Sequence, residues 1–224
     1  MISLHTAMKP VVAISFVALA ACQATTEDEL EKFVKDASRV SDAQAVLERI
    51  NGDEFGGPAG LANLSAGQVP TSGSVEYNGV GSLSFYVNDN GFTDFTDGNA
   101  ADFYGDAQVN VTFGATPAQT NITGSVSDLF ATRTTSTSLL DVGEANGSLT
   151  ITSGSVGTSG ASSLTANYTY DVTGFDRNLT GGGTATGNVL ADGGDTALRL
   201  NQDDVPVAST TPNLFLDLDI VGAD

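Results

Sequence analysis

The run Leu164-Thr-Ala-Asn-Tyr168-Thr-Tyr170-Asp-Val172 decides the fold, because apolar and polar residues alternate along it without a break. A period of two residues places successive side chains on opposite faces of a β-strand, so this strand would bury one face and expose the other to water. Shorter runs elsewhere repeat the alternation: Val75 and Tyr77, Leu83-Ser-Phe85-Tyr-Val87, Val109-Asn-Val111-Thr-Phe113 and Leu214-Phe-Leu216-Asp-Leu218-Asp-Ile220.

Clusters of turn-forming residues separate these runs. Asp89-Asn90-Gly91 and Asp97-Gly98-Asn99 are examples. With further runs at 120–126, 147–152, 183–190 and 196–200, the sequence contains about eight or nine strands between residues 72 and 224. Many antiparallel strands with one wet face close into a barrel or pack as a sandwich. The predicted fold class is therefore all-β.

A membrane-spanning barrel shows a similar alternation, with its apolar side chains facing lipid. Its strands need ~9–11 residues to cross a bilayer, and aromatic girdles mark both interfaces. The alternating runs in this chain are shorter, and only 7% of its residues are aromatic. We therefore expect the outer face of the β-sheet to be exposed to water and not to lipid.

Residues 8–22 have the layout of an export signal. Lys9 precedes an apolar run that is too short to remain as a membrane-spanning helix. The run ends Leu19-Ala-Ala-Cys22, which resembles a bacterial lipobox, where the cysteine is acylated and becomes the new N-terminus. The alternative is an ordinary secretory signal that contains a cysteine. We expect residues 1–22 to be a lipoprotein signal, with Cys22 as the lipid anchor.

The residue after the cysteine bears on the destination of such a lipoprotein. An Asp there favours inner-membrane retention in the known sorting pattern, and this chain has Gln23 instead. We therefore expect the outer membrane, where buried acyl methylenes contribute ~0.8 kcal/mol each to anchoring. Because Cys22 is the only cysteine, stability after export would come from the fold and not from disulfides.

The segment 23–50 is the only part with helical periodicity. Thr26 with Glu29, and later Ser41 with Gln44, have the spacing of capping boxes. Two such boxes predict two short helices or one kinked helix. Its apolar stripe either packs on the main domain, which we prefer, or docks on a partner. The stripe consists of Leu30, Phe33, Val34 and Ala37, continued by Val46, Leu47 and Ile50.

All 26 glycines follow residue 51, so the helical and strand-forming parts differ in composition. Residues 51–71 are rich in Gly, Pro and Ala and show no periodicity, which is typical of a linker. The predicted organisation is a signal over 1–22, a short helical segment over 23–50, this linker, and a Gly-rich β-domain over 72–224.

The charge of the chain limits its partners. There are 27 acidic and 8 basic residues, for a formal net charge of −19, and from residue 68 onward 18 acidic residues accompany only three arginines. Nucleic acid is excluded, because its binding depends on neutralising phosphates. A field of this sign would attract a basic protein. The alternative is that the charge only keeps the protein in solution.

The chemistry of the exported chain is restricted as well. His5 is the only histidine and precedes the expected cleavage site, so no imidazole would remain. This excludes histidine-dependent nucleophiles and histidine metal centres, and we expect no catalytic residues. A hydrolase that works with two carboxylates alone is the less favoured enzyme alternative.

One acidic stretch has the spacing of oxygen ligands. In the segment 88–99, Asp89, Asn90, Asp94 and Asp97 would offer hard oxygens to calcium. The segment lacks the bidentate glutamate of an EF-hand loop. We prefer a solvated loop whose Asp, Asn and Gly residues supply turn conformations, so calcium is the weaker alternative and no other cofactor is expected.

Three segments of the strand-rich part carry, in order, a small-residue strand entry, a strand that ends at Phe, and a Thr-Gly turn followed by an apolar residue. They are Gly73-Ser-Val-Glu-Tyr77-Asn-Gly79, Gly105-Asp-Ala-Gln-Val109-Asn-Val111-Thr-Phe113 and Ile122-Thr-Gly124-Ser-Val126. Together they resemble the barrel domain of the transferrin-binding protein B family, over roughly residues 72–200. The resemblance implies an antiparallel up-and-down β-barrel of eight strands on an outer-membrane or surface lipoprotein. It also implies binding of a host protein, a haem carrier or another solute.

The chain departs from that family in two respects. Where the family closes its barrel with Gly-x-Phe-x-Gly, this chain has Gly181-Gly-Gly-Thr-Ala-Thr-Gly187, without the aromatic residue. It also has no room for a full handle domain. We therefore do not expect transferrin itself as the ligand, and no binding residue of the family has a matching motif here.

These observations lead to one expected function. We expect a non-enzymatic, monomeric outer-membrane lipoprotein whose barrel binds a protein or a small solute. The alternative is a structural or adhesin-like acidic surface module without a small ligand.

Overall fold

The computed structural model describes residues 27–52, 59–89, 92–94, 101–134, 140–157, 162–175, 177–208 and 214–224. The chain forms two compact units, residues 1–42 and 43–224, and the α-helix α2 (Glu27–Asn51) runs from the first into the second. The helix is continuous, so the expected second start at Ser41 is wrong, and Ser41 and Gln44 lie inside it. No helix among the described residues is long and apolar enough to cross a membrane.

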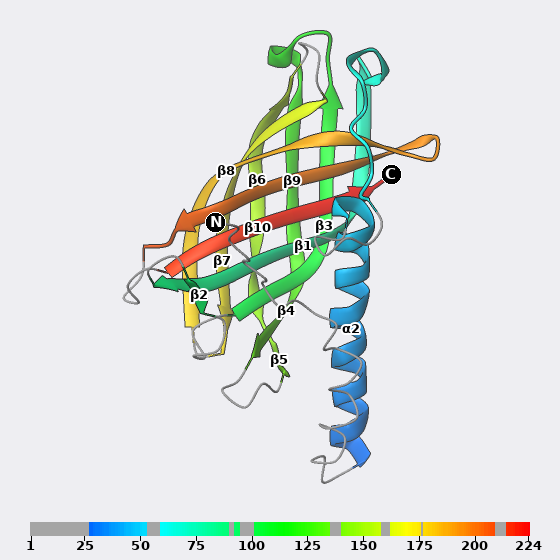
Figure 1. Cartoon of the computed structure of the whole chain (residues 1–224). Helices are drawn as coiled ribbons and strands as arrows, with labels where there is room; N and C mark the ends of the chain where they lie inside the picture. Colours follow the sequence, from blue (N-terminus) through cyan, green and yellow to red (C-terminus); the bar gives the residue numbers. More distant parts are fainter. Residues whose placement is uncertain are drawn as a thin grey trace, which may run out of the picture. The chain divides into compact units, whose positions relative to one another are not determined.

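The second unit is built around a closed, antiparallel β-barrel of eight strands (Figure 1). Consecutive barrel strands are neighbours, which is the up-and-down order, and β10 returns to pair with β1 from Asn78↔Ala223 to Val87↔Leu214. The all-β barrel prediction is confirmed. The barrel strands are β1 (Gly73–Asp89), β3 (Ala101–Phe113), β4 (Asn121–Thr134), β6 (Asn146–Val156), β7 (Ser163–Gly174), β8 (Arg177–Asp192), β9 (Asp195–Pro206) and β10 (Leu214–Ala223).

Four short elements complete the described fold. Strand β2 (Phe92–Asp94) pairs with β1, and β5 (Leu140–Glu144) pairs with β4. Two single-turn 3-10 helices, η1 (Ala66–Gln68) and η2 (Pro117–Gln119), lie between larger elements. Figure 1 shows the strands tilted around the barrel, so that β8, β9 and β10 cross the strands behind them at a steep angle.

The barrel strands are longer than the alternating runs of the sequence suggest. They contain from 10 residues in β10 to 17 in β1, so the expectation of strands too short to cross a bilayer is wrong. Glycines are the reason, because Gly79 and Gly81 lie within β1 and the run 181–187 lies within β8. A glycine in a strand has no side chain to mark its face, so the alternation is interrupted in the sequence but not in the sheet.

The orientation of the side chains shows which face of the wall is wet. Along β7, every second residue from Leu164 to Gly174 is buried, and the residues between them are exposed and polar. Strand β3 repeats this pattern, with Asp106, Gln108, Asn110 and Thr112 exposed. A membrane-spanning barrel has the opposite arrangement, with an apolar outer band. The expected water-facing outer wall is therefore present along these strands.

The last turns of α2 cover part of the outer wall. Ile50 is fully buried against Leu190 of β8 and Val221 of β10, and Val46 and Leu47 pack beside it. Packing on the barrel, the interpretation we preferred, is confirmed for these turns of the second unit. Thr26 and the side chains of Glu29, Leu30, Phe33 and Val34 lie outside the described part of the chain.

The segment expected as a linker is attached to the barrel over residues 59–69, which we name the strap. The backbone amide of Leu64 donates to the Val189 carbonyl (3.0 Å), and that of Ala191 donates to the Ala62 carbonyl (2.8 Å). Strand β8 extends beyond its last pair with β7, at Asn188, and the strap occupies the edge left free. Leu64 is buried in the main core, so the strap belongs to the folded domain.

Candidate functional site

The residues that the sequence singled out for lipid and calcium lie mostly outside the described chain. Cys22, Asn90 and Asp97 are not among the described residues, and the side chains of Asp89 and Asp94 are not described either. The backbones of Asp89 and Asp94 belong to the β1–β2 hairpin, where Asp89 pairs with Phe92 and Val87 with Asp94. No group of three or more metal-ligating side chains occurs among the residues that the structure describes.

The inside of the barrel is filled by its own side chains. Tyr77, Phe85 and Phe103 have at most 1% of their surface exposed. The Phe85 ring meets the ring of Phe103 edge to face at 5.7 Å, and that of Tyr170 at 5.6 Å. Such contacts add about 0.5–1.5 kcal/mol each to the burial of the rings. This layer is a packed core, formed by residues that are far apart in the sequence.

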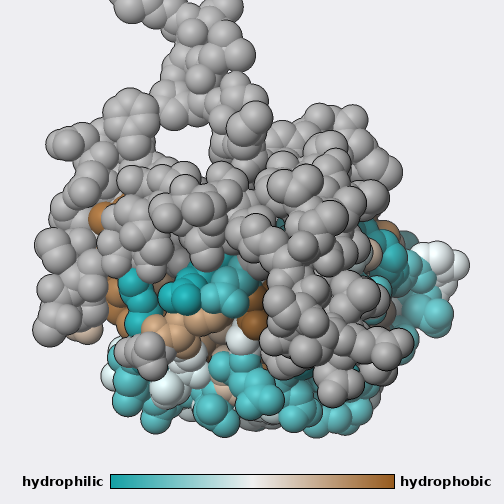
Figure 2. Space-filling view, turned by 90° about the horizontal axis from the view of Figure 1, so that it is seen from below, coloured by the Kyte–Doolittle hydropathy of each residue, from teal (hydrophilic) through white to brown (hydrophobic). Residues whose placement is uncertain are grey.

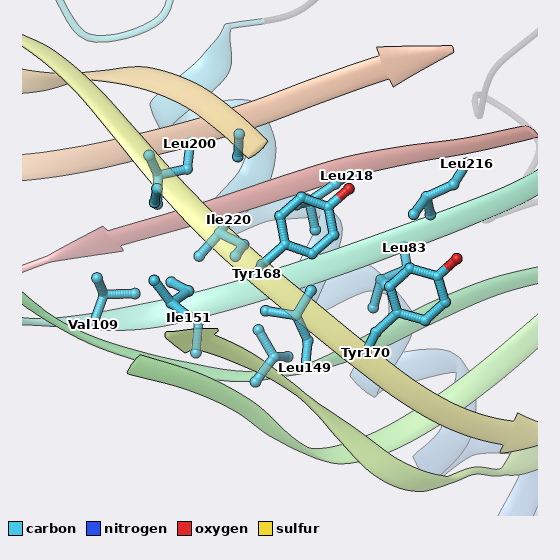
Figure 3. Close-up of a cluster of buried hydrophobic side chains, with 14 of the residues drawn as sticks. Leu83, Val109, Leu149, Ile151, Tyr168, Tyr170, Leu200, Leu216, Leu218 and Ile220 are labelled. Carbon is cyan, nitrogen blue, oxygen red and sulfur yellow. The ribbon is translucent and has the colours of Figure 1, made fainter. Parts of the chain in front are cut away.

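Two tyrosines of β7 occupy the positions opposite inner-facing glycines of β8. Tyr168 pairs with Gly183 and Tyr170 with Gly181. A Cβ atom at Gly181 would lie 2.5 Å from the Tyr170 hydroxyl oxygen, so only glycine leaves room for the ring. Figure 3 shows both tyrosines in one cluster with Leu83, Leu216, Leu218 and Ile220. The run 181–187 lacks the aromatic residue of the Gly-x-Phe-x-Gly pattern, and the interior beside it is filled instead by Tyr168 and Tyr170 of the neighbouring strand β7.

Two of the tyrosine hydroxyls of this interior have hydrogen-bond partners in the chain. The Tyr168 hydroxyl donates to the Gln202 Oε1 atom at 2.8 Å, and burial raises the pKa of Tyr168 to about 12. The Tyr77 hydroxyl lies 2.9 Å from Thr196 Oγ1, which in turn donates to Asp224 Oδ2 at 3.0 Å. Burial also raises the pKa of Tyr77. These phenols remain protonated at neutral pH and act as fixed hydrogen-bonding groups.

The charged groups lie on the outside, and most of them are acidic. Among the described residues no charged side chain is fully buried. Arg133, Arg177 and Arg199 are all partly buried, and Arg133 is further held by Asp141 (2.9 Å) and by the Phe175 ring (4.4 Å). From residue 59 onward the exposed carboxylates of the described residues are Glu76, Asp106, Asp128, Glu144, Asp171, Asp195, Asp203, Asp204 and Asp224.

The surface view agrees with this distribution. In Figure 2 the described atoms at the periphery are mostly hydrophilic, and hydrophobic atoms lie further in. Across β6, β7 and β8, the exposed row of Ser153, Asn167 and Thr184 is linked by side-chain hydrogen bonds of 3.2 and 2.9 Å. The outer wall of the strands therefore offers carboxylates and neutral polar groups, and its three arginines are partly buried, whereas Lys35, Arg39 and Arg49 of α2 are exposed.

One group of ionisable residues was not singled out by the sequence. The Tyr86 hydroxyl of β1 lies 2.6 Å from Asp204 Oδ1 of β9 and 3.0 Å from Asp217 Oδ1 of β10. The register of the β1–β10 closure, which pairs Tyr86 with Phe215, brings these residues together, and no local pattern in the sequence indicates it.

Comparisons with protein-family models, with curated proteins and with solved structures gave no match for this chain. The resemblance to the transferrin-binding protein B family therefore stays a prediction.

Proposed function

We propose that this chain is a non-enzymatic outer-membrane lipoprotein, anchored through an acylated Cys22, whose barrel binds a basic protein on its acidic outer wall. The anchor rests on the sequence of residues 8–22 alone. The mode of binding rests on the filled barrel and on the distribution of charge around it.

The filled interior is the observation that carries the proposal. Barrels that carry a small ligand keep a cavity between their walls. Here the Phe85 ring contacts Phe103 on the neighbouring strand β3 and Tyr170 across the barrel on β7, and Tyr168 and Tyr170 lie against glycines. A solute would have to displace this core, whereas a protein partner needs only the outer wall. The packing therefore favours a protein partner.

The charge of the outer wall favours a basic partner. Exposed carboxylates such as Asp106, Asp171 and Asp195 occur on three different strands, and the three arginines of the barrel strands are partly buried. A surface of one sign steers an oppositely charged partner toward it and raises the association rate. It also repels acidic proteins and anionic glycans.

The anchor is tested by metabolic labelling with a fatty-acid analogue. We expect the wild-type chain to be labelled and to fractionate with the outer membrane. A Cys22→Ser variant should lose both properties while its barrel still folds, because Cys22 precedes the whole described domain. Label that persists in the Cys22→Ser protein would refute the anchor.

The partner is tested with the exported chain as immobilised bait for a mixture of extracellular and envelope proteins. We expect one or a few basic proteins to be retained and to elute as salt screens the carboxylates. A bait with Asp106→Asn, Asp171→Asn and Asp195→Asn keeps the core and should retain them less strongly. If nothing salt-sensitive is retained, the structural or adhesin-like alternative replaces the proposal.

A further inference from the structure

A group on the outer wall joins three strands through one phenol. Tyr86 is 3% exposed, and its hydroxyl lies within hydrogen-bond distance of a carboxylate on β9 and of another on β10. The Tyr86 ring also stacks on Phe215 of β10, with ring centroids 6.1 Å apart. The group therefore spans β9, β10 and β1, and the last two of these strands close the barrel.

The backbone at this point is irregular. The register between β9 and β10 shifts between Leu216 and Leu218, and Asp204 has a φ of 54°, in the left-handed region that non-glycine residues seldom occupy. The amide of Asp204 donates to Asp217 Oδ1 at 2.7 Å. The bulge is thus held by the same carboxylate that faces Tyr86.

The electrostatic surroundings of Asp217 are unfavourable for its charge. Burial raises the pKa of Asp217 above its ordinary 3.8 and outweighs the hydrogen bonds from the Asp204 amide and Tyr86, which lower it; the negative charges of Asp203 and Asp204 on β9 add to the rise. On β10 the next outward carboxylate, Asp219, accepts a hydrogen bond from Asn51 of α2 at 3.3 Å. On β1 the facing ionisable group is Tyr86, whose pKa is itself raised, mainly by burial.

The number of hydroxyl hydrogens available to Tyr86, Asp204 and Asp217 determines how many hydrogen bonds these three side chains form. At neutral pH the two short oxygen–oxygen contacts of Tyr86 share a single hydroxyl hydrogen, so only one of them is a full hydrogen bond. A proton added to Asp217 supplies the second hydrogen. The Asp217 hydroxyl would then donate to Tyr86, and Tyr86 would donate to Asp204. We propose that Tyr86, Asp204 and Asp217 form a hydrogen-bonded cluster, which we call the clasp. The clasp gains a hydrogen bond and links β9, β10 and β1 more strongly when the pH falls.

The direction of the effect follows from proton linkage. The folded chain binds the proton on Asp217 more tightly than the unfolded chain does, so folding stability from this group increases as pH falls. The contribution is complete below the unfolded pKa of Asp217, near 3.8, and it is lost as pH rises through the higher folded pKa. Most paired carboxylates in proteins have the opposite dependence.

The test compares melting temperatures of full-chain variants between neutral pH and pH 4. Asp217→Asn keeps an acceptor for the Asp204 amide and brings amide hydrogens for Tyr86, so it imitates the protonated clasp. We expect its Tm at neutral pH to exceed that of the wild type by about 2–4 °C, the shift that ~1 kcal/mol of stability produces in a chain of this size. Its further gain on acidification should be smaller than that of the wild type.

Asp171→Asn is the matched control, because Asp171 is an exposed carboxylate on the outer face of β7. It removes the same formal charge and should keep the wild-type dependence of Tm on pH. Tyr86→Phe removes the shared oxygen and should also flatten the dependence. Equal pH profiles for Asp217→Asn and Asp171→Asn, or a wild-type profile in Tyr86→Phe, would overturn the clasp.

Discussion

At the scale of single residues, the barrel depends on pairing large inner side chains with positions that carry none. Gly81 of β1 faces Val126 of β4, and a Cβ atom added to Gly81 would lie 2.4 Å from Val126 Cγ2. Tyr170 and Gly181 have the same relation between β7 and β8. The abundance of glycine therefore reflects the dense interior, and at these positions it does not mark loops.

Gly81→Ala should destabilise the barrel. The added methyl group meets Val126, which is fully buried and has little room to move, and overpacking of this kind costs about 1–3 kcal/mol. The free energy of unfolding in urea measures the loss. The double variant Gly81→Ala/Val126→Ala should lose less than the sum of the two single changes, because each relieves the other.

Gly67→Ala provides the control for that series. A Cβ atom at Gly67 meets nothing within 4 Å, so its stability should stay within about 0.5 kcal/mol of the wild type. A Gly81→Ala protein as stable as Gly67→Ala would show that the interior is looser than these contacts indicate.

At the scale of elements, the sequence predicts the type of structure better than its extent. The strict alternation of β7 identified a half-buried strand, and every second residue from Leu164 is indeed buried. Strand lengths were underestimated where glycines interrupt the pattern, as in β8. The strap was interpreted as a linker because backbone hydrogen bonds such as that from Leu64 to Val189 leave no mark in side-chain periodicity.

Helix α2 shows a related limit of prediction from the sequence. Ser41 and Gln44 have the spacing of a capping box, yet they lie inside α2, because helical hydrogen bonding continues wherever the neighbouring residues permit it. The apolar stripe of Val46, Leu47 and Ile50 was the more reliable signal, since it reflects burial on the barrel. Periodicity over several turns thus outweighs a single capping pair.

The contact between α2 and the barrel wall should be a major source of stability. Ile50→Ala removes a fully buried side chain from the cluster with Leu190 and Val221, and we expect a loss of about 2–5 kcal/mol in the free energy of unfolding. Glu48→Ala, at an exposed position of the same turn, is the control and should be nearly neutral. If Ile50→Ala matches Glu48→Ala in urea unfolding, these helical turns are not part of the cooperative domain.

At the scale of the whole molecule, closure of the barrel creates contacts that no local pattern contains. Tyr86 and Asp217 are separated by 131 positions along the chain, and they meet because β10 pairs with β1 in one particular register. A shift of that register by one residue would turn Asp217 inward and Leu216 outward. The hydrophobic alternation of both strands therefore fixes the clasp indirectly, although neither strand alone predicts it.

Net charge acts on the same scale. The chain carries a formal charge of −19, and exposed carboxylates are spread over the outer wall of the barrel, so their mutual repulsion opposes the compact state. We expect the Tm at neutral pH to rise when sodium chloride is increased from ~0.01 M to ~0.15 M, because the screening length falls from ~30 Å to ~8 Å. Sodium chloride is preferred to sulfate, which strengthens apolar burial as well.

The same titration at pH 4 separates charge from other effects of salt. Protonation removes many of the negative charges at that pH, so the rise in Tm with sodium chloride should shrink while the core and its hydrogen bonds stay the same. An uncharged osmolyte at matched osmolarity controls for solvent effects and should act equally at both pH values. A salt-independent Tm at neutral pH, or an equal rise at pH 4, would mean that repulsion among the carboxylates does not destabilise the folded state. The carboxylates would then be available to a basic partner without any cost to stability.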